Sequence, residues 1–299
     1  MGLIASLKKV KSNKQTEKIK IAVVKAADED VLHSIKRGLE DGMIEPVLID
    51  DAKELKDLMA KLDIGLDEVT IIDEADDKKA AARGVELAHA GEVGALMKGF
   101  IGTGDFLRPV VNKEMGIRFS SLLSHVAVLY VSKLKRFLAI TDGGMVIQPN
   151  KEEYKIIIDH GIKVMQSINI QKPKAALLSA SENIIPIYEP SMWASELTNE
   201  MNNENFVVEG PISLDLALVP EIAKQKKYKG EIQGDADIIV TPDIASGNSL
   251  AKSLTIFGDS EMAGLIIGAT VPIILTSRSS SSNEKYGSIL LARHYMDSK

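Results

Sequence analysis

The feature that most constrains the fold of this sequence is a regular alternation of short apolar runs with longer amphipathic segments. The runs are rich in Val, Ile and Leu, which is typical of strands buried on both faces. They cover residues 20–24, 46–49, 69–72, 94–97, 125–131, 137–141, 174–179, 206–208, 237–241 and 272–276. The helical segments cover residues 29–40, 52–62, 77–90, 106–114, 151–168, 191–204, 249–257 and 285–296. This alternation predicts parallel βαβ units in a three-layer α/β architecture.

One pair of strands interrupts the alternation. Only five residues separate the runs at 125–131 and 137–141, so we expect these two strands to pair antiparallel. Asp142, Gly143 and Gly144 follow directly, ahead of a long helix. The change of connectivity indicates a junction between two α/β halves.

Composition excludes several classes of function. The chain of 299 residues has a net charge of -6, so it has no global attraction for nucleic acid, and any phosphate needs a local basic cluster. It has no cysteine, which removes disulfides and thiolate sites and fits a cytoplasmic location. No two of the five histidines have metal-ligand spacing, and the longest apolar stretches are broken by Gly and Pro. We therefore expect no metal and no membrane partner.

The loop at residues 98–109 is the first candidate for chemistry, because open α/β sheets bind ligands beyond the carboxyl ends of their strands. It holds three glycines and a threonine between a strand and a helix, and Arg108 follows. Backbone N–H groups at Thr103 and Gly104 could approach an anion there. Alternatively the glycines only form turns and Arg108 is a solvated helix residue.

Three further loops carry unusual residues after a strand. Residues 276–284 contain Ser277 and Arg278, a hydroxyl beside a guanidinium that suits phosphate or an oxyanion, although Ser281 or Ser282 could simply cap the last helix beside Glu284. Residues 241–249 contain Asp243, Gly247 and Asn248, and here capping by Asn248 or Ser249 is the favoured interpretation. Asp142 belongs either to a tight turn or to a site.

At these same loops the sequence resembles the phosphate acetyl/butyryltransferase family. The resemblance rests on "LMKGFIGTGDFLRPVVNKEMGIR" (96–118), "LSHVAVLYV" (123–131), "FLAITDGGMVIQPN" (137–150), "ADIIVTPDIASGNSLAKSL" (236–254) and "GLIIGATVPIILTSRSSSSNEK" (264–285). The Met-Lys-Gly and Leu-Arg-Pro motifs and the length are similar to the butyryl branch of that family.

The resemblance implies a fold and a reaction. The fold is two α/β domains around a cleft that holds the active site, similar to isocitrate and isopropylmalate dehydrogenases. One domain would comprise residues 1–145 with 266–299, and the other residues 146–265. The reaction would reversibly transfer a short acyl group, butyryl by this resemblance, between coenzyme A and inorganic phosphate, giving acyl phosphate by direct attack in a ternary complex. It implies no bound cofactor, coenzyme A only as a substrate, and a homo-oligomer.

The resemblance also assigns roles to residues. Arg108, with Thr103 and Gly104, would bind phosphate, and Ser277 and Arg278 would stabilise the reacting acyl centre. Glu284 occupies the position at which acetyl members carry the aspartate that takes the thiol proton, six residues after Arg278. A second group, with no assigned chemistry, would lie at the cleft or bind coenzyme A: Asp142, Asp243, Gly247 and Asn248.

Three alternatives remain open. The chain could be a phosphate acetyltransferase of the same family. It could be a nicotinamide-dependent decarboxylating dehydrogenase, a class that needs a cluster of metal-binding aspartates and a Lys/Tyr pair, although no such aspartate cluster is evident. It could also be a non-catalytic sensor of acyl-CoA, which would use the same loops.

Overall fold

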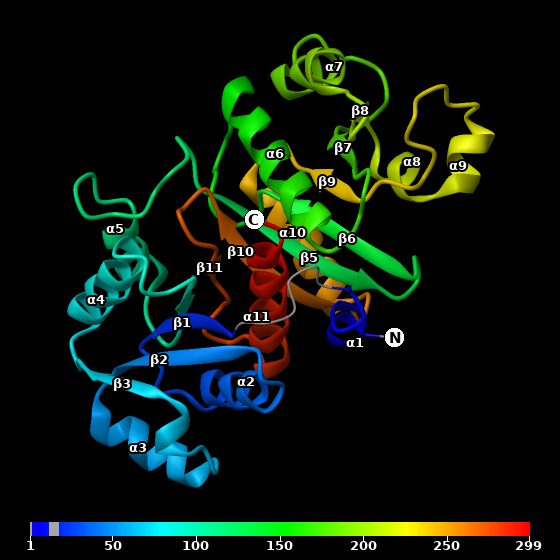
Figure 1. Cartoon of the computed structure of the whole chain (residues 1–299). Helices are drawn as coiled ribbons and strands as arrows, with labels where there is room; N and C mark the ends of the chain where they lie inside the picture. Colours follow the sequence, from blue (N-terminus) through cyan, green and yellow to red (C-terminus); the bar gives the residue numbers. More distant parts are fainter. Residues whose placement is uncertain (1, 12–17) are drawn as a thin grey trace. The chain divides into compact units, whose positions relative to one another are not determined.

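The computed structural model describes residues 2–11 and 18–299, and the chain forms two compact units (Figure 1). Unit 1 comprises Met1–Ser6 and Ser124–Met262, and unit 2 comprises Leu7–Leu123 and Ala263–Lys299. These divisions follow Leu123 and Met262, whereas the sequence suggested residues 145 and 265. The domain assignment from the sequence stays a prediction.

The sheet of unit 2 is mainly parallel. Its strands lie in the order β3-β2-β1-β4-β11-β10, and only β10 and β11 pair antiparallel. The bounds are β1 (Ile19–Val24), β2 (Ile44–Asp50), β3 (Thr70–Asp73), β4 (Ala95–Lys98), β10 (Glu261–Ile267) and β11 (Ile273–Ile274). Because β1 and β11 both pair parallel with β4, the carboxyl ends of these three strands meet at one edge.

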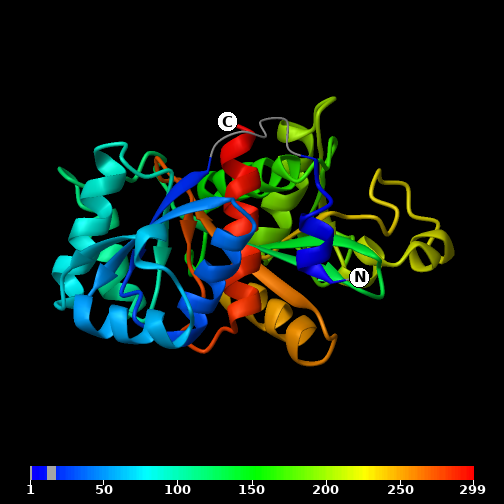
Figure 2. The same cartoon turned by 60° about the horizontal axis from the view of Figure 1, so that its bottom comes forward.

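Helices cover both faces of the unit 2 sheet. They are α2 (Glu29–Glu40), α3 (Ala52–Lys61), α4 (Asp77–His89), α5 (Thr103–Val110) and α11 (Ser282–Asp297), with a 3-10 turn η1 (Leu66–Glu68). Gly38 of α2 packs on Ile44, whereas Gly84 of α4 packs on Ile49, and these two β2 side chains point to opposite faces. α11 lies beside α2 in both ribbon views (Figures 1 and 2). Unit 2 therefore has three layers.

The sheet of unit 1 has the order β5-β6-β9-β7-β8. Its strands are β5 (Ser124–Val131), β6 (Arg136–Thr141), β7 (Lys174–Leu178), β8 (Val207–Ile212) and β9 (Ile238–Val240). β5 and β6 pair antiparallel, as predicted, and the other pairs are parallel. The carboxyl ends of β7, β8 and β9 therefore lie at one edge.

Unit 1 also has helices on both faces of its sheet. They are α6 (Lys151–Ser167), α7 (Glu189–Met201), α8 (Leu214–Leu218), α9 (Pro220–Gln225) and α10 (Ile244–Ile256), and a short α1 (Leu3–Leu7) opens the chain. Ile239 belongs to a buried cluster that includes Ala251 of α10, and Ile238 lies against Gly161 of α6. Because neighbouring strand residues point to opposite faces, α6 and α10 cover opposite faces.

The predicted α/β class is confirmed, but several element boundaries were wrong. The helix expected at 106–114 runs over Thr103–Val110, because Asn112 Oδ1 accepts hydrogen bonds from the N–H groups of Glu114 and Met115 and turns the chain. The helix expected at 249–257 begins at Ile244, because Asp243 caps it. Capping by Asn248 or Ser249 was therefore wrong. β10, α8 and α9 were not predicted.

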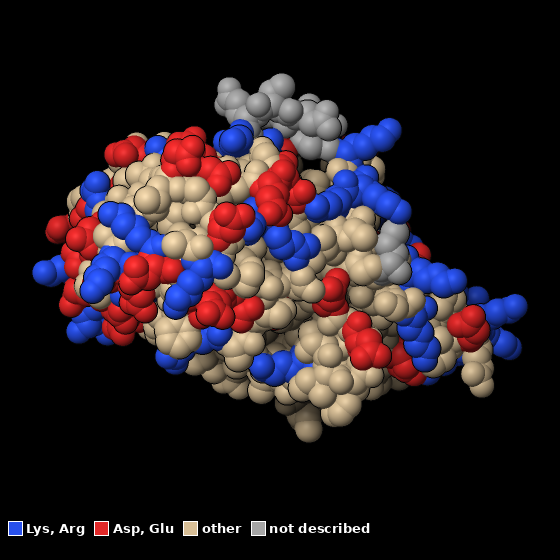
Figure 3. All heavy atoms as spheres, turned by 90° about the horizontal axis from the view of Figure 1, so that it is seen from below, with Lys and Arg blue, Asp and Glu red and all other residues tan. Residues whose placement is uncertain are grey.

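Two properties of the described residues bear on partners. No helix among residues 2–11 and 18–299 is long and apolar enough to cross a membrane. The same part of the chain holds no group of three or more His, Cys, Asp or Glu side chains that could hold a metal ion. On the face shown in Figure 3, acidic and basic side chains lie next to one another at the left, whereas the lower middle is mostly uncharged.

Candidate active site

Two loops that carry predicted site residues lie at the same sheet edge of unit 2. One follows β4 and leads into α5, and the other follows β11 and leads into α11. β4 and β11 are neighbouring parallel strands. The guanidinium carbon of Arg278, from the second loop, lies 6.0 Å from the centroid of the Phe100 ring in the first. The fold therefore brings these loops side by side.

The first turn of α5 presents free backbone donors. Gly102 is the N-cap and has no side chain to accept from the helix, so Thr103 and Gly104 occupy the first helical positions without a side-chain cap. The N–H groups of a first turn lack intrahelical partners, and the positive end of the helix dipole favours an anion. Both residues are exposed. The geometry suits the predicted anion site, which stays a prediction.

Arg108 lies on the same helix and faces solvent. Its side chain is 70% exposed, and Nη1 lies 3.6 Å from Oδ1 of Asp105 one turn earlier. An exposed ion pair of this length contributes little to stability. Arg108 is therefore held weakly and is available to a ligand.

Ser277 and Arg278 are both exposed, in the loop after β11. The Oγ atoms of Ser277 and Ser279 lie 3.0 Å apart, and the N–H of Ser279 donates to Ser277 Oγ over 3.4 Å. The Ser277 hydroxyl is thus oriented by its own loop. A hydroxyl beside a guanidinium offers several donors to an oxyanion.

Glu284 lies in the first turn of α11 and is half-buried. Its N–H donates to Oγ of the N-cap Ser281 over 3.4 Å, which decides between the two capping serines suggested by the sequence. A carboxylate in a first helical turn is stabilised by the helix dipole. Glu284 lies in the helical turn that directly follows the Arg278 loop, although no contact fixes its role as a base.

Two buried lysines lie behind these loops, and sequence reasoning passed over both. Lys98 ends β4 and Lys285 lies in α11, and each is 2% exposed. The sequence offered only an ambiguous signal, a lysine that closes an otherwise apolar strand, because lysine is rarely buried in full. Thr276, at the start of the second loop, is 4% exposed, and its Oγ1 has no hydrogen-bond partner among the described residues.

The electrostatics of Lys98 are unusual. Burial, with the positive charges of Arg278 and Lys285, lowers its pKa from 10.5 to about 8, and the carboxylate of Asp28 opposes this only in part. A charged group in a low-dielectric setting loses its hydration, and nearby like charges make this worse. The charge of the candidate residue Arg278 therefore acts directly on the pKa of Lys98.

The predicted residues of unit 1 also come together, but through structural bonds. Asp142 accepts from the N–H groups of His125, Gly144 and Met145, each over 2.7 Å. Asn248 Nδ2 donates to the carbonyl of Gly143 over 3.0 Å. A Cβ at Gly247 would lie 2.5 Å from the carbonyl oxygen of Asp142, so only glycine fits there without a shift.

Asp243 anchors the same region. Its Oδ1 accepts from the N–H of Ser246 over 2.8 Å, and its Oδ2 accepts from the Ser246 hydroxyl over 2.9 Å. These bonds cap α10. The turn at Asp142 and the start of α10 therefore form one locked assembly in unit 1.

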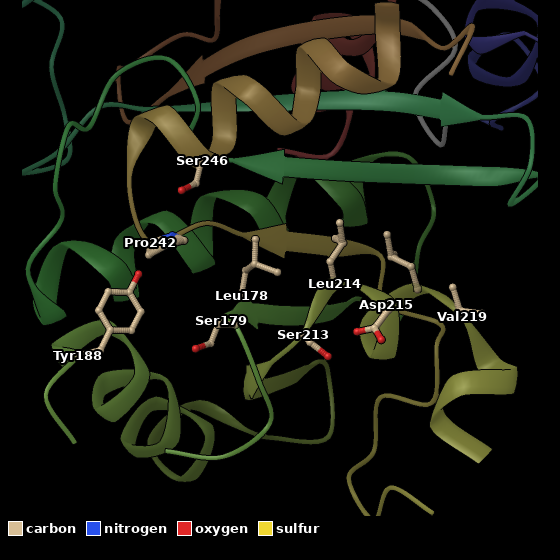
Figure 4. A pocket seen from close by; sticks show the side chains of 11 residues that line it. Leu178, Ser179, Tyr188, Ser213, Leu214, Asp215, Val219, Pro242 and Ser246 are labelled. Atoms are coloured by element: carbon tan, nitrogen blue, oxygen red, sulfur yellow. The ribbon is translucent and has the colours of Figure 1, made fainter. Parts of the chain in front are cut away.

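A cavity of about 770 Å³ opens beside this assembly, at the carboxyl ends of β7, β8 and β9 (Figure 4). Tyr188, Pro242 and Ser246 lie on one side of it, and Leu178 and Leu214 lie near its middle. The described residues that line it include no Lys or Arg. The cavity therefore suits an uncharged and partly apolar ligand group.

Comparison with known proteins identifies the family. Residues 77–293 match the model of the family described as "Phosphate acetyl/butaryl transferase". This match contains every candidate residue of both units. The match therefore covers most of the chain and does not depend on any single loop.

Individual relatives agree with the family match. The chain is 37% identical to the phosphate butyryltransferase of Clostridium acetobutylicum, with 93% of this chain and 94% of that protein covered. It is 34% identical to the phosphate acetyltransferase of Rickettsia prowazekii, with 92% and 79% covered. The crystal structure of a branched-chain phosphotransacylase from Enterococcus faecalis V583 matches this fold with a TM-score of 0.84 and 32% sequence identity. The match covers 93% of this chain and 99% of that protein chain. The chain therefore belongs to the phosphate acetyl/butyryltransferase family and is a phosphate acyltransferase.

Proposed function

We propose that this enzyme reversibly transfers a short acyl group, butyryl in preference to acetyl, between coenzyme A and inorganic phosphate. Support for butyryl comes from the Met-Lys-Gly motif at residues 97–99 and from relatives named for butyryl and branched-chain transfer. Relatives named phosphate acetyltransferase are nearly as similar, so the acetyl reaction is the second candidate.

The proposal is supported chiefly by the pair of loops at one edge of the unit 2 sheet. The first offers Thr103, Gly104 and Arg108 to phosphate, and the second offers Ser277 and Arg278 to the acyl centre. Arg278 lies over Phe100 of the first loop, so donors for both groups lie within one short stretch of surface. Neighbouring sites for two reactants are what direct transfer in a ternary complex needs.

The reaction then takes place in one substitution at the acyl carbon. From acyl phosphate, Glu284 accepts the proton of the coenzyme thiol, and the sulfur forms a bond with the acyl carbon. Ser277 and Arg278 donate to the oxyanion that develops, and the bond from carbon to the phosphate oxygen then breaks. Phosphate leaves with its charge held by Arg108 and the first turn of α5. The reverse reaction follows the same path.

The coenzyme would use residues of unit 1 as well. We assign Asp142, Asp243, Gly247 and Asn248 an indirect role, because their polar groups are already engaged in holding the start of α10. The nearby cavity lacks cationic lining among the described residues, so it suits the uncharged pantetheine arm better than the coenzyme phosphates. We also expect a cytoplasmic homo-oligomer, and light scattering would check its oligomeric state.

Initial rates with a series of acyl-CoAs test the proposal. Coenzyme A release would be measured with phosphate and acetyl-, propionyl-, butyryl- or longer acyl-CoA, with and without EDTA. We expect kcat/KM to be highest with butyryl-CoA and unchanged by EDTA. Highest kcat/KM with acetyl-CoA would favour the second candidate, and loss of activity in EDTA would contradict a metal-free reaction.

A further inference from the structure

The candidate site of unit 2 contains a cluster of cations without carboxylate partners. Lys98 and Lys285 are buried at 2% exposure, and the exposed Arg278 acts on Lys98 through its charge. Within residues 2–11 and 18–299, none of these three side chains forms an ion pair. Buried charges are normally paired, because a charge that loses its hydration without gaining a partner is strongly destabilised.

Lys25, which follows the neighbouring strand β1, shows the usual arrangement. Val24 is in register with Lys98, so the two lysines lie at the same sheet edge. Lys25 forms ion pairs with Asp50 and, over 3.5 Å, with Asp77. Burial opposes its charge, but these carboxylates outweigh burial and raise its pKa. The same edge therefore supplies ion-paired carboxylates to Lys25, whereas Lys98 feels the charge of Asp28 without forming an ion pair.

The two buried lysines support the two site loops. Lys98 Nζ donates to the carbonyl of Gly99 over 3.1 Å, and Lys285 Nζ donates to the carbonyl of Ser280. Thr276 adds a buried hydroxyl that has no hydrogen-bond partner in the described part of the chain. A positive cluster with an unused hydroxyl, placed under two donor-rich loops, fits an anion as the missing partner.

We propose that Lys98 and Lys285 are positioning residues of the phosphate site, and that their missing counter-charge is inorganic phosphate or the phosphate of an acyl phosphate. The inference rests on the proposed function, because it adds charge to the site assigned there to Arg108 and Arg278. Neither lysine needs to touch the reacting atoms. Each lysine places a positive charge beneath the loops whose residues contact the reacting atoms.

Phosphate binding should depend on the protonation of Lys98. The pKa of Lys98 is lowered to about 8 by burial, Arg278 and Lys285, against the attraction of Asp28. Lys98 is charged below that pH and largely neutral above it. At higher pH an anion must bind together with a proton taken from solvent, so its affinity falls. Between pH 7 and pH 9 this loss amounts to about tenfold.

The test compares Lys98→Met and Lys98→Arg with the wild type in the full-length enzyme. The KM for phosphate and its dissociation constant from calorimetry would be measured between pH 7 and pH 9. Phosphate itself titrates in this range, so inhibition by sulfate serves as a second probe that keeps its charge. Lys20→Met is the matched control for losing one positive charge, because Lys20 is a half-buried lysine of β1 whose side chain is 40% exposed.

We expect wild type and Lys20→Met to lose about tenfold in sulfate affinity over this range. Lys98→Arg should hold its affinity constant, because its charge does not titrate. Lys98→Met should bind about tenfold or more weakly at pH 7 and show no further loss, since the titrating charge beneath the loops is removed. Equal pH profiles in wild type and Lys98→Met would overturn the inference. Because Lys98→Arg keeps a charge, it remains informative if the Met variant does not fold.

Failure of the proposed function gives a different result. If no acyl-CoA releases coenzyme A but phosphate and sulfate still bind with this pH dependence, the acyl transfer is wrong and the anion site stands. If coenzyme A is released and the KM for phosphate is the same in the wild type and in Lys98→Met, the function stands and the inference is wrong.

Discussion

At the scale of single residues, exposure separates the groups that can meet a substrate from those that support them. Arg108, Ser277 and Arg278 are exposed, whereas Lys98, Thr276 and Lys285 are buried directly behind them. Glu284 lies between, half-buried in the first turn of α11. The surface layer carries the donors, and the buried layer sets their electrostatic environment.

Glu284→Gln tests the identity of the base. Glutamine keeps the size of the side chain but cannot accept the thiol proton, so kcat from acyl phosphate and coenzyme A should fall by about 10²–10⁴. Glu284→Asp keeps the carboxylate and should retain much more of the rate. Nearly full turnover by Glu284→Gln would move the base to another residue.

The exposed candidate residues could be predicted from the sequence, whereas the buried lysines could not, for a physical reason. The sequence placed Arg108 and Arg278 after strands, where open sheets bind ligands. It did not reveal Lys98, because one lysine at the end of an apolar strand has the same pattern whether its side chain is buried or reaches solvent. Only the packing of α11 and the loop after β11 decides that.

At the scale of elements, tertiary contacts decided what local patterns left open. Asp243, Asn248 and Ser249 can all cap a helix. Asp243 does so, in a helix whose Gly247 lies against the carbonyl of Asp142, a long-range contact that no local pattern reveals. β10 escaped prediction because its residues are part of one long apolar stretch that continues through Gly268 towards β11.

Gly247→Ala should destabilise unit 1 by about 1–3 kcal/mol, because the added Cβ would overlap with Asp142 O and with Thr241 Oγ1 at 2.6 Å. Trp193, the only tryptophan, lies in α7 of unit 1, so its fluorescence during urea unfolding reports this change. Gly104→Ala is the stability control, since a Cβ added at Gly104 would have no other atom within 4 Å among the described residues. Equal unfolding midpoints for the two variants would contradict the close contact.

The attachment of α6 to β5 should depend on pH. Ser124 Oγ lies 2.7 Å from Nδ1 of His160, and burial lowers the pKa of His160 from 6.5 to about 4. A depressed histidine pKa means that the unfolded chain takes up a proton first as the pH falls. Stability is therefore lost from about pH 6.5 downwards, by about 2 kcal/mol at pH 5.

His160→Gln removes this titration and keeps a polar partner for Ser124. Urea unfolding at pH 7 and pH 5, followed by Trp193 fluorescence, should show a smaller difference for the variant than for the wild type. His125 is half-buried, and loss of hydration also lowers its pKa, so some acid sensitivity should remain. An unchanged difference would mean that His160 is not held neutral.

At the scale of the whole molecule, the candidate residues divide between the two units by chemistry. Unit 2 holds the residues proposed for phosphate and acyl transfer, and unit 1 holds a locked turn and a cavity without cationic lining among the described residues. The alternation of strands and helices predicted both sheets, and the matched motifs predicted the family. The two units divide after Leu123, ahead of the β5–β6 hairpin, whereas the change of connectivity after that hairpin suggested a boundary at residue 145, which stays a prediction.

We propose that the two adjoining loops of unit 2 carry the acyl transfer. The most direct test is the rate of coenzyme A release from butyryl-CoA and phosphate by the Arg278→Ala variant, with Lys133→Ala, an exposed lysine of unit 1, as control. Loss of one donor to a developing oxyanion lowers kcat by about 10²–10³. We predict that loss for Arg278→Ala with unchanged thermal unfolding, and wild-type rates for Lys133→Ala. A folded Arg278→Ala enzyme with near wild-type kcat would show that Arg278 does not stabilise the reacting acyl centre.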